Sequence, residues 1–460
     1  MSRKVVILGS GESGTGAAVL AKVKGFDVFV SDMGLIKDAY KEILQSRKIP
    51  FEEGQHTAEL IFPCDLIIKS PGIPDKAPMV SQARNAGIPV IDELEFAFRY
   101  LTGKVIAITG TNGKTTTTLL TYHLLSSAGF DVALAGNVGR SLAAQVAERN
   151  HDWYVIEISS FQLDGTETFR PDIGILTNIT PDHLDRYDYR MENYIRSKFR
   201  LTANMKASDH FIFYGDDPVL KSETTGRAFI PAVHRVSLAD KTCPVHAEGE
   251  EMHFGAVASR FTIPQQQTTL KGPHNLINTM CAVTAAQLAG VPEASIRSSL
   301  KTFRNAPHRL ESVGTINGIE FVNDSKATNV DSVVYALGSY RQPLIWIAGG
   351  IDKGNDYGLI RDAVAQKVRA LICLGKDNTR LREAFGDVVN RISETQDVRE
   401  LVRMALAQAE AGDVVLLSPA CASFDLFRNY EDRGNRFRDA VQELKAELIA
   451  DSRLKPETTE

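Results

Sequence analysis

Short runs of β-branched and other apolar residues alternate along the chain with longer stretches in which apolar residues recur at helical spacing. The first unit has an apolar run at Lys4–Leu8, a helical pattern at Gly16–Lys24 and a second apolar run at Val28–Ser31. Such alternation is typical of parallel sheets covered by helices. The pattern therefore predicts an α/β fold.

This pattern restarts twice, which predicts domain boundaries. A helix-like stretch at Asp92–Tyr100 leads to a new strand at Val105–Thr109, and a third series begins with a strand at Ile319–Asn323. At 460 residues the chain is also too long for one hydrophobic core. We therefore expect three domains, which cover residues 1–97, 98–304 and 305–460.

The later elements follow the same logic. Residues 210–265 look rich in β-structure, and two helices are expected after them, at Asn275–Ala289 and Pro292–Phe303. The third block is expected to supply further strands at Leu344–Ala348, Ala370–Leu374 and Val414–Leu417.

Composition and charge narrow the class of protein. Hydrophobic residues make up 43% of the chain and charged residues 24%, which is ordinary for a soluble globular protein. The net charge of −5 does not favour nucleic acid or anionic lipid, whose phosphates attract basic surfaces. No apolar run approaches the roughly 20 residues that span a bilayer, and we see no signal-peptide pattern. We expect a monomer with no nucleic-acid partner and no membrane insertion.

The cysteines indicate the compartment. An odd, scattered set without Cys-x-x-Cys or Cys/His clustering suits a reducing environment and argues against a disulfide framework or a zinc site. We therefore expect a cytoplasmic protein. The five cysteines are Cys64, Cys243, Cys281, Cys373 and Cys421.

A glycine-rich loop follows the first expected strand. Residues 9–14 match Gly-x-Gly-x-x-Gly between a strand and a helix, and Asp32 ends the next strand. Glycines let backbone N–H groups approach a diphosphate at a helix N-terminus, and the acid can accept hydrogen bonds from a ribose. The motif alone fits NAD or FAD, the diphosphate of a UDP-sugar, or a tight turn without a ligand.

A second glycine-rich loop, Gly110–Thr116, lies between the strand at Val105–Thr109 and a helix. Its pattern predicts that Lys114 reaches the terminal phosphates of a nucleotide and that the Thr115 hydroxyl ligates Mg²⁺. The usual first glycine would fall at Ile108, so the loop is a variant of the motif. The alternative is a glycine-rich turn beside a solvated lysine.

A carboxylate that can hold the metal ion comes later in the same block. The expected strand Trp153–Ser159 carries Glu157 near its carboxyl end, where Mg²⁺ is met in such folds. The alternative is an acid that faces solvent, although the neighbouring Val155 and Ile158 favour burial.

Several motifs together resemble the Mur ligase family, in order and over essentially the whole chain. Besides the loop around Lys114, the motifs are Glu157–Leu163, Asn178–Asp185, His274–Asn278, Pro307–Arg309, Asn323–Asn329, Gly349–Lys353 and Ser418–Asp425. The resemblance implies a Rossmann-like N-terminal domain, a central P-loop ATPase domain and a Rossmann-like C-terminal domain.

The resemblance also implies an activity. Mur ligases use ATP to turn a substrate carboxylate into an acyl phosphate, which an amine then attacks. Three motifs, which contain Phe161, Lys326 and Cys421, look like the member that adds D-glutamate to UDP-N-acetylmuramoyl-L-alanine in peptidoglycan precursor synthesis. The alternatives are another Mur-type or a folylpolyglutamate-type amino acid ligase, an NAD-dependent oxidoreductase, and a non-catalytic nucleotide-binding module.

Residue by residue, the resemblance implies catalytic roles for Lys114, His183 and Lys198. It implies ligands for two Mg²⁺ ions in Thr115, Glu157, His183 and Lys198. It implies contacts with ATP from Gly110, Thr111, Asn112, Gly113, Lys114, Thr115, Thr116, Asn278, Arg309, Asp324 and Lys326.

Two of these residues would not be chosen without the family. Lys198 otherwise reads as a helix-surface lysine, and an ammonium cannot bind a cation. The family carbamylates the matching lysine, which makes it an anionic oxygen donor but requires a neutral amine, and hence a pKa lowered from about 10.4. His183 otherwise reads as a loop or N-cap residue, because imidazole is an unusual ligand for Mg²⁺.

The resemblance further implies contacts with both substrates. Those expected at the UDP-sugar are Ser10, Gly11, Ser13, Gly14, Asp32, Ser70, Pro71, Gly72, Asn137, Ser159 and His183. Those expected at D-glutamate are Thr328, Lys353, Ser423, Phe424 and Tyr430. Without the family, Arg309, Lys326 and Lys353 read as solvated surface side chains.

Overall fold

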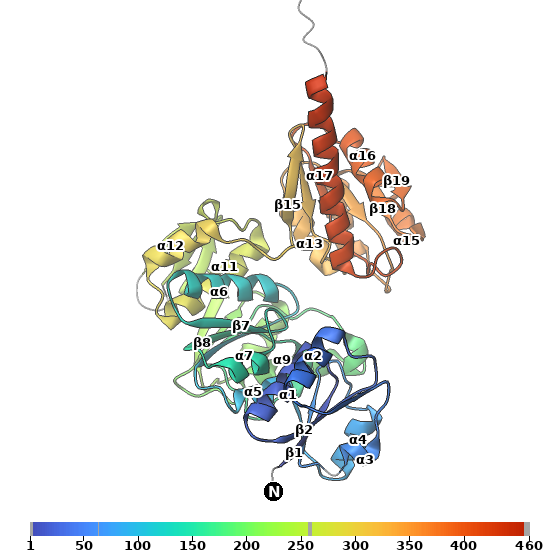
Figure 1. Ribbon diagram of the computed structural model, residues 1–460. Helices are drawn as coiled ribbons and strands as arrows, with labels where there is room; N and C mark the ends of the chain where they lie inside the picture. The colour runs from blue at the N-terminus through green and yellow to red at the C-terminus, as the bar shows by residue number, and fades with distance from the viewer. Residues whose placement is uncertain (1–2, 63, 256–259, 455–460) are drawn as a thin grey trace, which may run out of the picture. The chain divides into compact units, whose positions relative to one another are not determined.

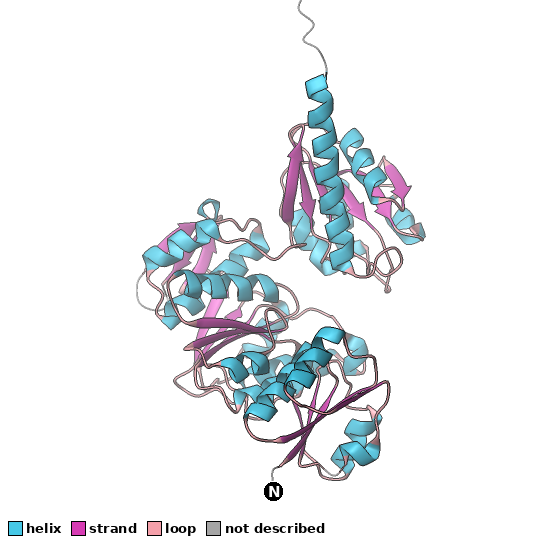
Figure 2. Ribbon diagram, viewed as in Figure 1, coloured by secondary structure: helices cyan, strands magenta, loops and turns pink. Residues whose placement is uncertain are grey.

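The protein is described by a computed structural model that covers residues 3–62, 64–255 and 260–454. Strands and helices alternate around three separate sheets (Figures 1 and 2). Most strands in each sheet are parallel, so the predicted α/β fold is confirmed. Among the described residues, no helix is both long and apolar enough to cross a bilayer.

The described chain forms two compact units. The first contains Met1–Thr269 and Leu276–Phe303, and the second contains Leu270–Asn275 and Arg304–Glu460. The first unit holds two of the sheets and the second unit holds the third. The three-domain division expected from the sequence stays a prediction.

The first sheet has five parallel strands in the order β3-β2-β1-β4-β5. Chain order reverses beside β1, so the loop after β1 lies at a topological switch point, where open α/β sheets bind ligands. The strands are β1 (Lys4–Leu8), β2 (Asp27–Asp32), β3 (Phe51–Glu53), β4 (Leu66–Lys69) and β5 (Val90–Asp92). The helices are α1 (Glu12–Val23), α2 (Asp38–Ser46), α3 (Ala58–Ile61), α4 (Pro78–Asn85) and α5 (Glu93–Phe98).

The second sheet has nine strands in the order β14-β13-β12-β11-β10-β9-β6-β8-β7, and only its first two pairings are antiparallel. The strands are β6 (Lys104–Thr109), β7 (Val132–Gly136), β8 (Trp153–Glu157), β9 (Ile173–Leu176), β10 (His210–Tyr214), β11 (Ala232–Ser237), β12 (Val245–Glu248), β13 (Glu251–Phe254) and β14 (Phe261–Pro264). The helices are α6 (Lys114–Ser127), α7 (Leu142–Glu148), α8 (Ser160–Asp164), η1 (Leu184–Tyr187), α9 (Met191–Phe199), η2 (Arg200–Thr202), α10 (Pro218–Thr224), η3 (Gln265–Gln267), α11 (Pro273–Ala289) and α12 (Glu293–Thr302).

The third sheet, in the second unit, has the order β15-β16-β20-β17-β18-β19, with β15 antiparallel to its neighbour. The long helix α17 packs against β15 and β16 (Figure 1). The strands are β15 (Glu311–Ile316), β16 (Ile319–Asn323), β17 (Leu344–Ala348), β18 (Val368–Leu374), β19 (Ile392–Thr395) and β20 (Val414–Leu417). The helices are α13 (Val330–Gly338), α14 (Gly358–Lys367), α15 (Thr379–Phe385), α16 (Val398–Gln408) and α17 (Tyr430–Leu454).

One predicted helix begins earlier than expected. The helical pattern suggested Gly16–Lys24, whereas α1 begins at Glu12 and ends at Val23. Gly11 takes the extended N-cap conformation, and the acidic Glu12 interacts favourably with the positive end of the helix. Glycine and glutamate carry little apolar signal, so periodicity alone places the start too late.

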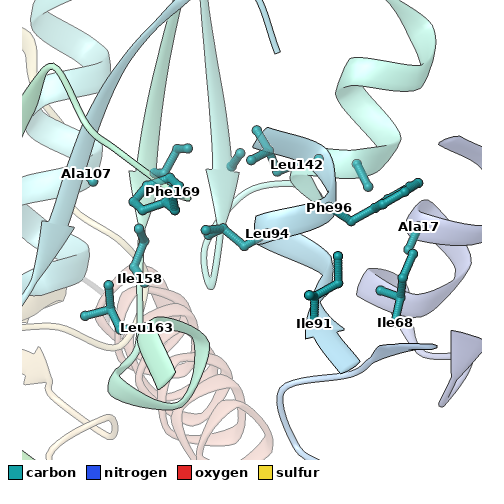
Figure 3. Packing of buried hydrophobic residues seen from close by; sticks show 14 of the residues in the cluster. Ala17, Ile68, Ile91, Leu94, Phe96, Ala107, Leu142, Ile158, Leu163 and Phe169 are labelled. Carbon is teal, nitrogen blue, oxygen red and sulfur yellow. The ribbon is translucent and has the colours of Figure 1, made fainter. Parts of the chain in front are cut away.

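Helix α5 joins the cores of the first two sheets. In Figure 3 its Leu94 and Phe96 lie between Ala17 and Ile68 on one side and Phe169 on the other. All five side chains are buried and belong to one hydrophobic cluster. The two sheets are therefore parts of one continuous packing arrangement.

Two buried carboxylates of α5 add polar contacts to this packing. Glu93 Oε1 accepts hydrogen bonds from Ser141 Oγ and the Ala143 N–H, each at 2.7 Å. Glu95 Oε2 accepts from three successive N–H groups, those of residues 167–169, at 2.9, 3.0 and 2.9 Å. Buried carboxylates are tolerated when they are satisfied in this way. They fix α5 against the second sheet.

Candidate functional site

The loop after β6 has the backbone of a phosphate cradle. Gly110 has a φ of +146° and Gly113 a φ of +82°, both in a region that side chains rarely adopt. A Cβ on Gly110 would lie 1.9 Å from Thr177 Oγ1, and one on Gly113 would lie 2.4 Å from Asn278 Oδ1. Glycine is therefore required at both ends of the turn. The adenine contact expected of Asn278 stays a prediction, but its amide lies beside this loop.

Residues that follow β9 hold the loop in place. The Asn112 N–H donates to Asn178 Oδ1 at 2.8 Å, and Thr177 Oγ1 donates to the Asn112 carbonyl at 2.6 Å. The Lys114 ammonium turns back over the loop and donates to the Thr111 carbonyl at 2.6 Å. The loop is thus held by contacts within the protein, which limits the entropy lost on binding.

Lys198, on α9, lies beneath this loop. It is 1% exposed, and its Nζ donates to the Gly110 carbonyl at 2.8 Å and lies 4.4 Å from the centroid of the Tyr194 ring. Burial, with the nearby Lys114 ammonium, holds the pKa of Lys198 well below its ordinary value, although Asp182 and Asp164 act in the opposite direction. The interpretation as a helix-surface lysine is therefore wrong.

Glu157 ends β8 beside the strand that carries the loop, with its Cα opposite that of Ile108. It is buried, so it is not a solvent-facing acid. Its Oε1 accepts from Asn137 Nδ2 at 2.7 Å. Its Oε2 is also buried and has no hydrogen-bond partner within the described part of the chain. Such an oxygen is costly to bury unless a cation or donor meets it.

These residues fit a magnesium ion. Mg²⁺ prefers oxygen ligands, and the unpartnered oxygen of Glu157 and the hydroxyl of Thr115 are of that kind. Thr115 is buried on the first turn of α6, directly after Lys114. The neutral amine favoured at Lys198 is the form that carbamylation requires.

The strand before Ser159 ends earlier than expected. The expected strand Trp153–Ser159 stops at Glu157, because Ser159 is the N-cap of α8. Its Oγ accepts from the Gln162 N–H at 3.3 Å, while Gln162 Oε1 accepts from the Ser159 N–H at 2.9 Å. This reciprocal pair is a capping box. The expected sugar contact of Ser159 stays a prediction.

His183 is the most exposed of the residues expected at the metal. Its side chain is 58% exposed, and its backbone has a φ of +51° at the N-cap of η1. Its Nε2 lies 3.7 Å from Asp182 Oδ2, and its ring meets Phe161 edge-on with a centroid separation of 5.3 Å. The position is therefore open to a ligand, and the metal role of His183 stays a prediction.

The loop after β1 is held by the side chains of Asp32 and Ser70. The Ser10 N–H donates to Asp32 Oδ2 at 2.5 Å, and the Gly34 N–H donates to Asp32 Oδ1 at 2.8 Å. A Cβ on Gly14 would lie 1.8 Å from the Gly9 carbonyl oxygen, so the first turn of α1 requires glycine at this position. Ser13 and Pro71 are half-buried near the surface, and Gly11 and Gly72 are exposed. Ser70 Oγ donates to the Gly9 carbonyl at 3.3 Å.

In the second unit, Asp324 lies directly after β16. It is buried, and its carboxylate accepts from Ser418 Oγ at 2.9 Å and from the Leu310 N–H at 3.2 Å. Burial raises the pKa of Asp324 to about 7, against the lowering effect of the Ser418 hydrogen bond. Lys326 Nζ lies 3.8 Å from the centroid of the Tyr430 ring, so it is not a freely solvated lysine.

The residues expected at the amino acid lie on adjacent loops. The Ile351 N–H donates to the Ala422 carbonyl at 2.8 Å, and the Ala422 N–H donates back at 3.2 Å. This bridge joins the loop of Lys353, which is exposed, to the loop of Ser423, which is buried. Phe424 is 65% exposed. Thr328 is half-buried on the loop that follows Asp324.

The sequence reasoning missed Arg433, which organises these loops. It is 1% exposed and lies near the start of α17. Its guanidinium donates to Ser325 Oγ and the Ser325 carbonyl, both at 2.9 Å, and to the Gly349 and Cys421 carbonyls, both at 3.2 Å. One signal was available, because Arg433 falls on the same helical stripe as the buried Phe437.

A strand, a glycine-rich loop with a lysine and a helix, with a buried acid on the next strand, define a P-loop enzyme that uses a nucleotide. Family models match three parts of the chain: "MurD N-terminal domain" at residues 4–79, "Mur ligase middle domain" at 108–286 and "Mur ligase, glutamate ligase domain" at 308–421. The chain belongs to the Mur ligase family and is an ATP-dependent ligase that forms amide bonds.

Curated relatives match this chain over nearly its full length. Proteins from Bacteroides fragilis and Cytophaga hutchinsonii, each named UDP-N-acetylmuramoylalanine--D-glutamate ligase, are 50% identical over 444 and 456 residues. Each match covers 96% of this chain and 100% of the relative.

Solved structures share the fold. The UDP-N-acetylmuramate-alanine ligase MurC from Thermotoga maritima has a TM-score of 0.61 at 18% identity, over 96% of this chain and 100% of its own. The MurF ligase from Thermotoga maritima in complex with ADP has a TM-score of 0.59 at 14% identity, over 93% of this chain and 99% of its own.

Proposed function

We propose that this enzyme joins D-glutamate to UDP-N-acetylmuramoyl-L-alanine, with hydrolysis of ATP to ADP and phosphate, in peptidoglycan precursor synthesis. Relatives named for that reaction, 50% identical over nearly the whole chain, support the choice of substrates. The match to the "MurD N-terminal domain" supports it at the end that carries the first glycine-rich loop. A cytoplasmic location and a monomeric state remain part of this proposal.

The proposed reaction has two steps. The γ-phosphoryl group of ATP passes to the alanine carboxylate of the UDP-linked substrate, which releases ADP and forms an acyl phosphate. The amine of D-glutamate then attacks the acyl carbon, the C–N bond forms, phosphate leaves and the amine loses a proton. The chemistry brings several anions together, so cationic groups and fixed N–H donors must neutralise them.

Within this scheme Lys114 neutralises the transferred phosphoryl group, and the N–H groups of Gly110–Thr116 orient it. Thr115, Glu157, His183 and a carbamylated Lys198 would hold Mg²⁺. The metal would supply positive charge at the phosphate oxygens. The unpartnered buried oxygen of Glu157 is the observation that supports a cation there.

Carbamylation of Lys198 needs carbon dioxide as its only co-reactant. The neutral amine attacks carbon dioxide, an N–C bond forms, and one proton is released to give a carbamate anion. Burial and the Lys114 charge both favour the neutral amine that this step needs. The single observation that carries the mechanistic proposal is this buried lysine, 2.8 Å from the carbonyl of the phosphate loop.

The remaining contacts are proposed by type. Ser10, Gly11, Ser13, Gly14, Asp32, Ser70, Pro71 and Gly72 would bind the UDP group, and Asn137 and Ser159 the sugar and lactyl parts. Asn278, Arg309, Asp324 and Lys326 would bind ATP. Thr328, Lys353, Ser423, Phe424 and Tyr430 would bind D-glutamate, with charge-assisted hydrogen bonds from Lys353 and the Ser423 hydroxyl to a carboxylate.

The decisive experiment is ATP-dependent phosphate release by the purified enzyme with Mg²⁺ and UDP-N-acetylmuramoyl-L-alanine. We expect turnover with D-glutamate and at least about 100-fold less with L-glutamate or diaminopimelate, because the site must place one amine on the acyl carbon. Product mass identifies the new amide. Turnover with another amino acid would change the assigned substrate. ATP binding without phosphate release under every condition would show a nucleotide-binding module that is not an enzyme.

A further inference from the structure

The hairpin formed by β12 and β13 carries a cluster of ionisable side chains on one face. Successive residues of both strands alternate between the core and the opposite face. Val245, Ala247, Met252 and Phe254 are buried in the core. The opposite face carries His246, Glu248 and His253, and the proposed ligase chemistry uses none of them.

Strand pairing places the two histidines side by side. His246 lies directly opposite His253, and Thr262 of β14 lies opposite His253 on the other side. The two imidazole rings are stacked, with centroids 4.8 Å apart and planes 5° apart. His246 Nε2 lies 3.8 Å from Glu248 Oε1, and one ligand atom of each residue lies within 4.8 Å of the others.

Hydrogen bonds leave the Nε2 atoms as the available ligands. His246 Nδ1 lies 2.7 Å from the Cys243 carbonyl, which only accepts, so Nδ1 carries the proton. His253 Nδ1 lies 3.2 Å from Thr262 Oγ1, and its Nε2 is buried with no partner in the residues that the structure describes. Metal-bound histidines are commonly held in this way, with the other ring nitrogen bonded to a carbonyl or hydroxyl.

The charge of this face also favours a cation. Glu251 lies directly opposite Glu248, and like charges in that position are unfavourable. Lys241 offsets part of the charge, but its Nζ approaches Glu248 Oε2, at 3.3 Å. The other oxygen, Oε1, is the one nearer to His246.

We propose that His246, Glu248 and His253 bind a divalent transition metal of the zinc class, which cross-links β12 to β13. Two imidazoles and one carboxylate form a common zinc donor set, with a fourth position for water. Bonds of about 2.0–2.2 Å to one ion place ligand atoms about 3–3.5 Å apart, so the two rings must turn from their parallel stack until both Nε2 atoms point at the ion. In the sheet, β11, β10 and β9 separate this hairpin from the strand β6 of the phosphate loop. The site is therefore separate from the proposed ligase reaction.

The test uses full-length enzyme, freed of metal by a chelator and then kept in excess Mg²⁺ to occupy sites made of oxygen ligands. Co²⁺ serves as the probe, because nitrogen-ligated Co²⁺ absorbs visible light and zinc displaces it. We expect one equivalent of Co²⁺ to give this absorption, and Zn²⁺ to abolish it. A wild-type enzyme without a zinc-sensitive Co²⁺ spectrum would overturn the proposal.

Variants locate the ion. His253→Gln and Glu248→Gln are each expected to weaken Co²⁺ binding by more than about tenfold. Glu248 is exposed, so its substitution is not expected to disturb folding. The matched control is His234→Gln, because His234 also pairs with a histidine, His210, with Nε2 and Nδ1 3.0 Å apart, but outside this cluster. Unchanged binding in both cluster variants would refute the site, whatever the ligase activity of the enzyme.

Discussion

The two glycine-rich loops of the first unit share a strand–loop–helix geometry but meet charge in different ways. After β1, both oxygens of Asp32 accept backbone N–H groups of nearby loops. After β6, one oxygen of Glu157 is buried without a partner in the described residues, and the Lys198 amine is buried below the loop. The first loop is complete in itself, whereas the second lies beside a buried carboxylate oxygen that a bound cation can satisfy.

This difference suits the first loop to substrate binding and the second to the chemical step. A loop whose charges are already satisfied can hold a ligand through backbone donors and shape. A loop beside an unpartnered buried carboxylate oxygen favours a cation, whose charge can then stabilise a transferring phosphoryl group. Substitutions in the second loop region are therefore expected to affect turnover, and those in the first to affect substrate affinity.

The largest expected effect is that of Lys198→Ala. Loss of the anionic ligand proposed at this position is expected to reduce kcat by about 10²–10³-fold. Added bicarbonate will not restore activity, because no amine remains to be carbamylated. The control Lys206→Ala changes an exposed lysine just beyond the same helix and is expected to leave kcat unchanged. Near wild-type turnover of Lys198→Ala would remove the carbamate from the mechanism.

A somewhat smaller effect is expected from Glu157→Gln. The amide keeps the shape and can still bond Asn137, but it offers a weaker ligand for Mg²⁺. The Mg²⁺ concentration that gives half-maximal activity is expected to rise at least about tenfold. A titration of activity with Mg²⁺ measures this shift. A lower kcat with an unchanged Mg²⁺ dependence would mean that Glu157 acts in some other way.

The first loop is tested by Asp32→Ala. Hydrogen bonds to a charged group contribute about 1.5–3 kcal/mol, so KM for the UDP-linked substrate is expected to rise about tenfold or more. The value of kcat is expected to stay within about twofold of wild type. Initial-rate measurements at saturating ATP separate the two parameters. The reverse result, a lower kcat at constant KM, would mean that the first loop also acts in turnover and not only in substrate affinity.

The smallest effect concerns the junction between the two sheets. Asp92 is fully buried beside Gly165, and within the described chain neither of its carboxyl oxygens has a hydrogen-bond partner. Burial raises the pKa of Asp92 to about 8, above the ordinary value of 3.8. The folded state therefore holds a proton that the unfolded state has released, and stability is expected to fall as the pH rises from about 4 to about 8.

Urea unfolding at pH 5 and pH 8 measures this dependence. For Asp92→Asn, which cannot ionise, we expect the loss between the two values to be smaller by about 1 kcal/mol or more. Activity at pH 7 should change little. Equal pH dependence in the variant and the wild type would assign the effect to other groups.

Much of the fold follows from the sequence because its strands are short, apolar and regularly spaced. The predicted strands Lys4–Leu8, Ile319–Asn323 and Val414–Leu417 match β1, β16 and β20 residue for residue. Two of the errors lie at element ends that helix N-cap residues determine. Gly11 starts α1 early and Ser159 stops β8 early, and neither effect shows in hydrophobic periodicity.

The candidate site was less accessible to sequence reasoning. Spacing alone indicated Lys114 and Glu157, but Lys198 required a resemblance, because its burial comes from tertiary packing. Arg433 and the pair His246 and His253 escaped notice for a related reason. Their partners are backbone carbonyls or residues on a neighbouring strand, and a linear pattern does not reveal these contacts.

Arg433 makes a single side chain responsible for holding three loops together. Of the four hydrogen bonds described for its guanidinium, three go to the main-chain carbonyls of residues 325, 349 and 421. Substitution of the Cys421 side chain would therefore leave its carbonyl bond to Arg433 available, whereas a lysine at 433 would supply one point of contact in place of a fork. An inhibitor that relies on the shape of these loops would meet resistance through their side chains more readily than through a change of the arginine that holds them.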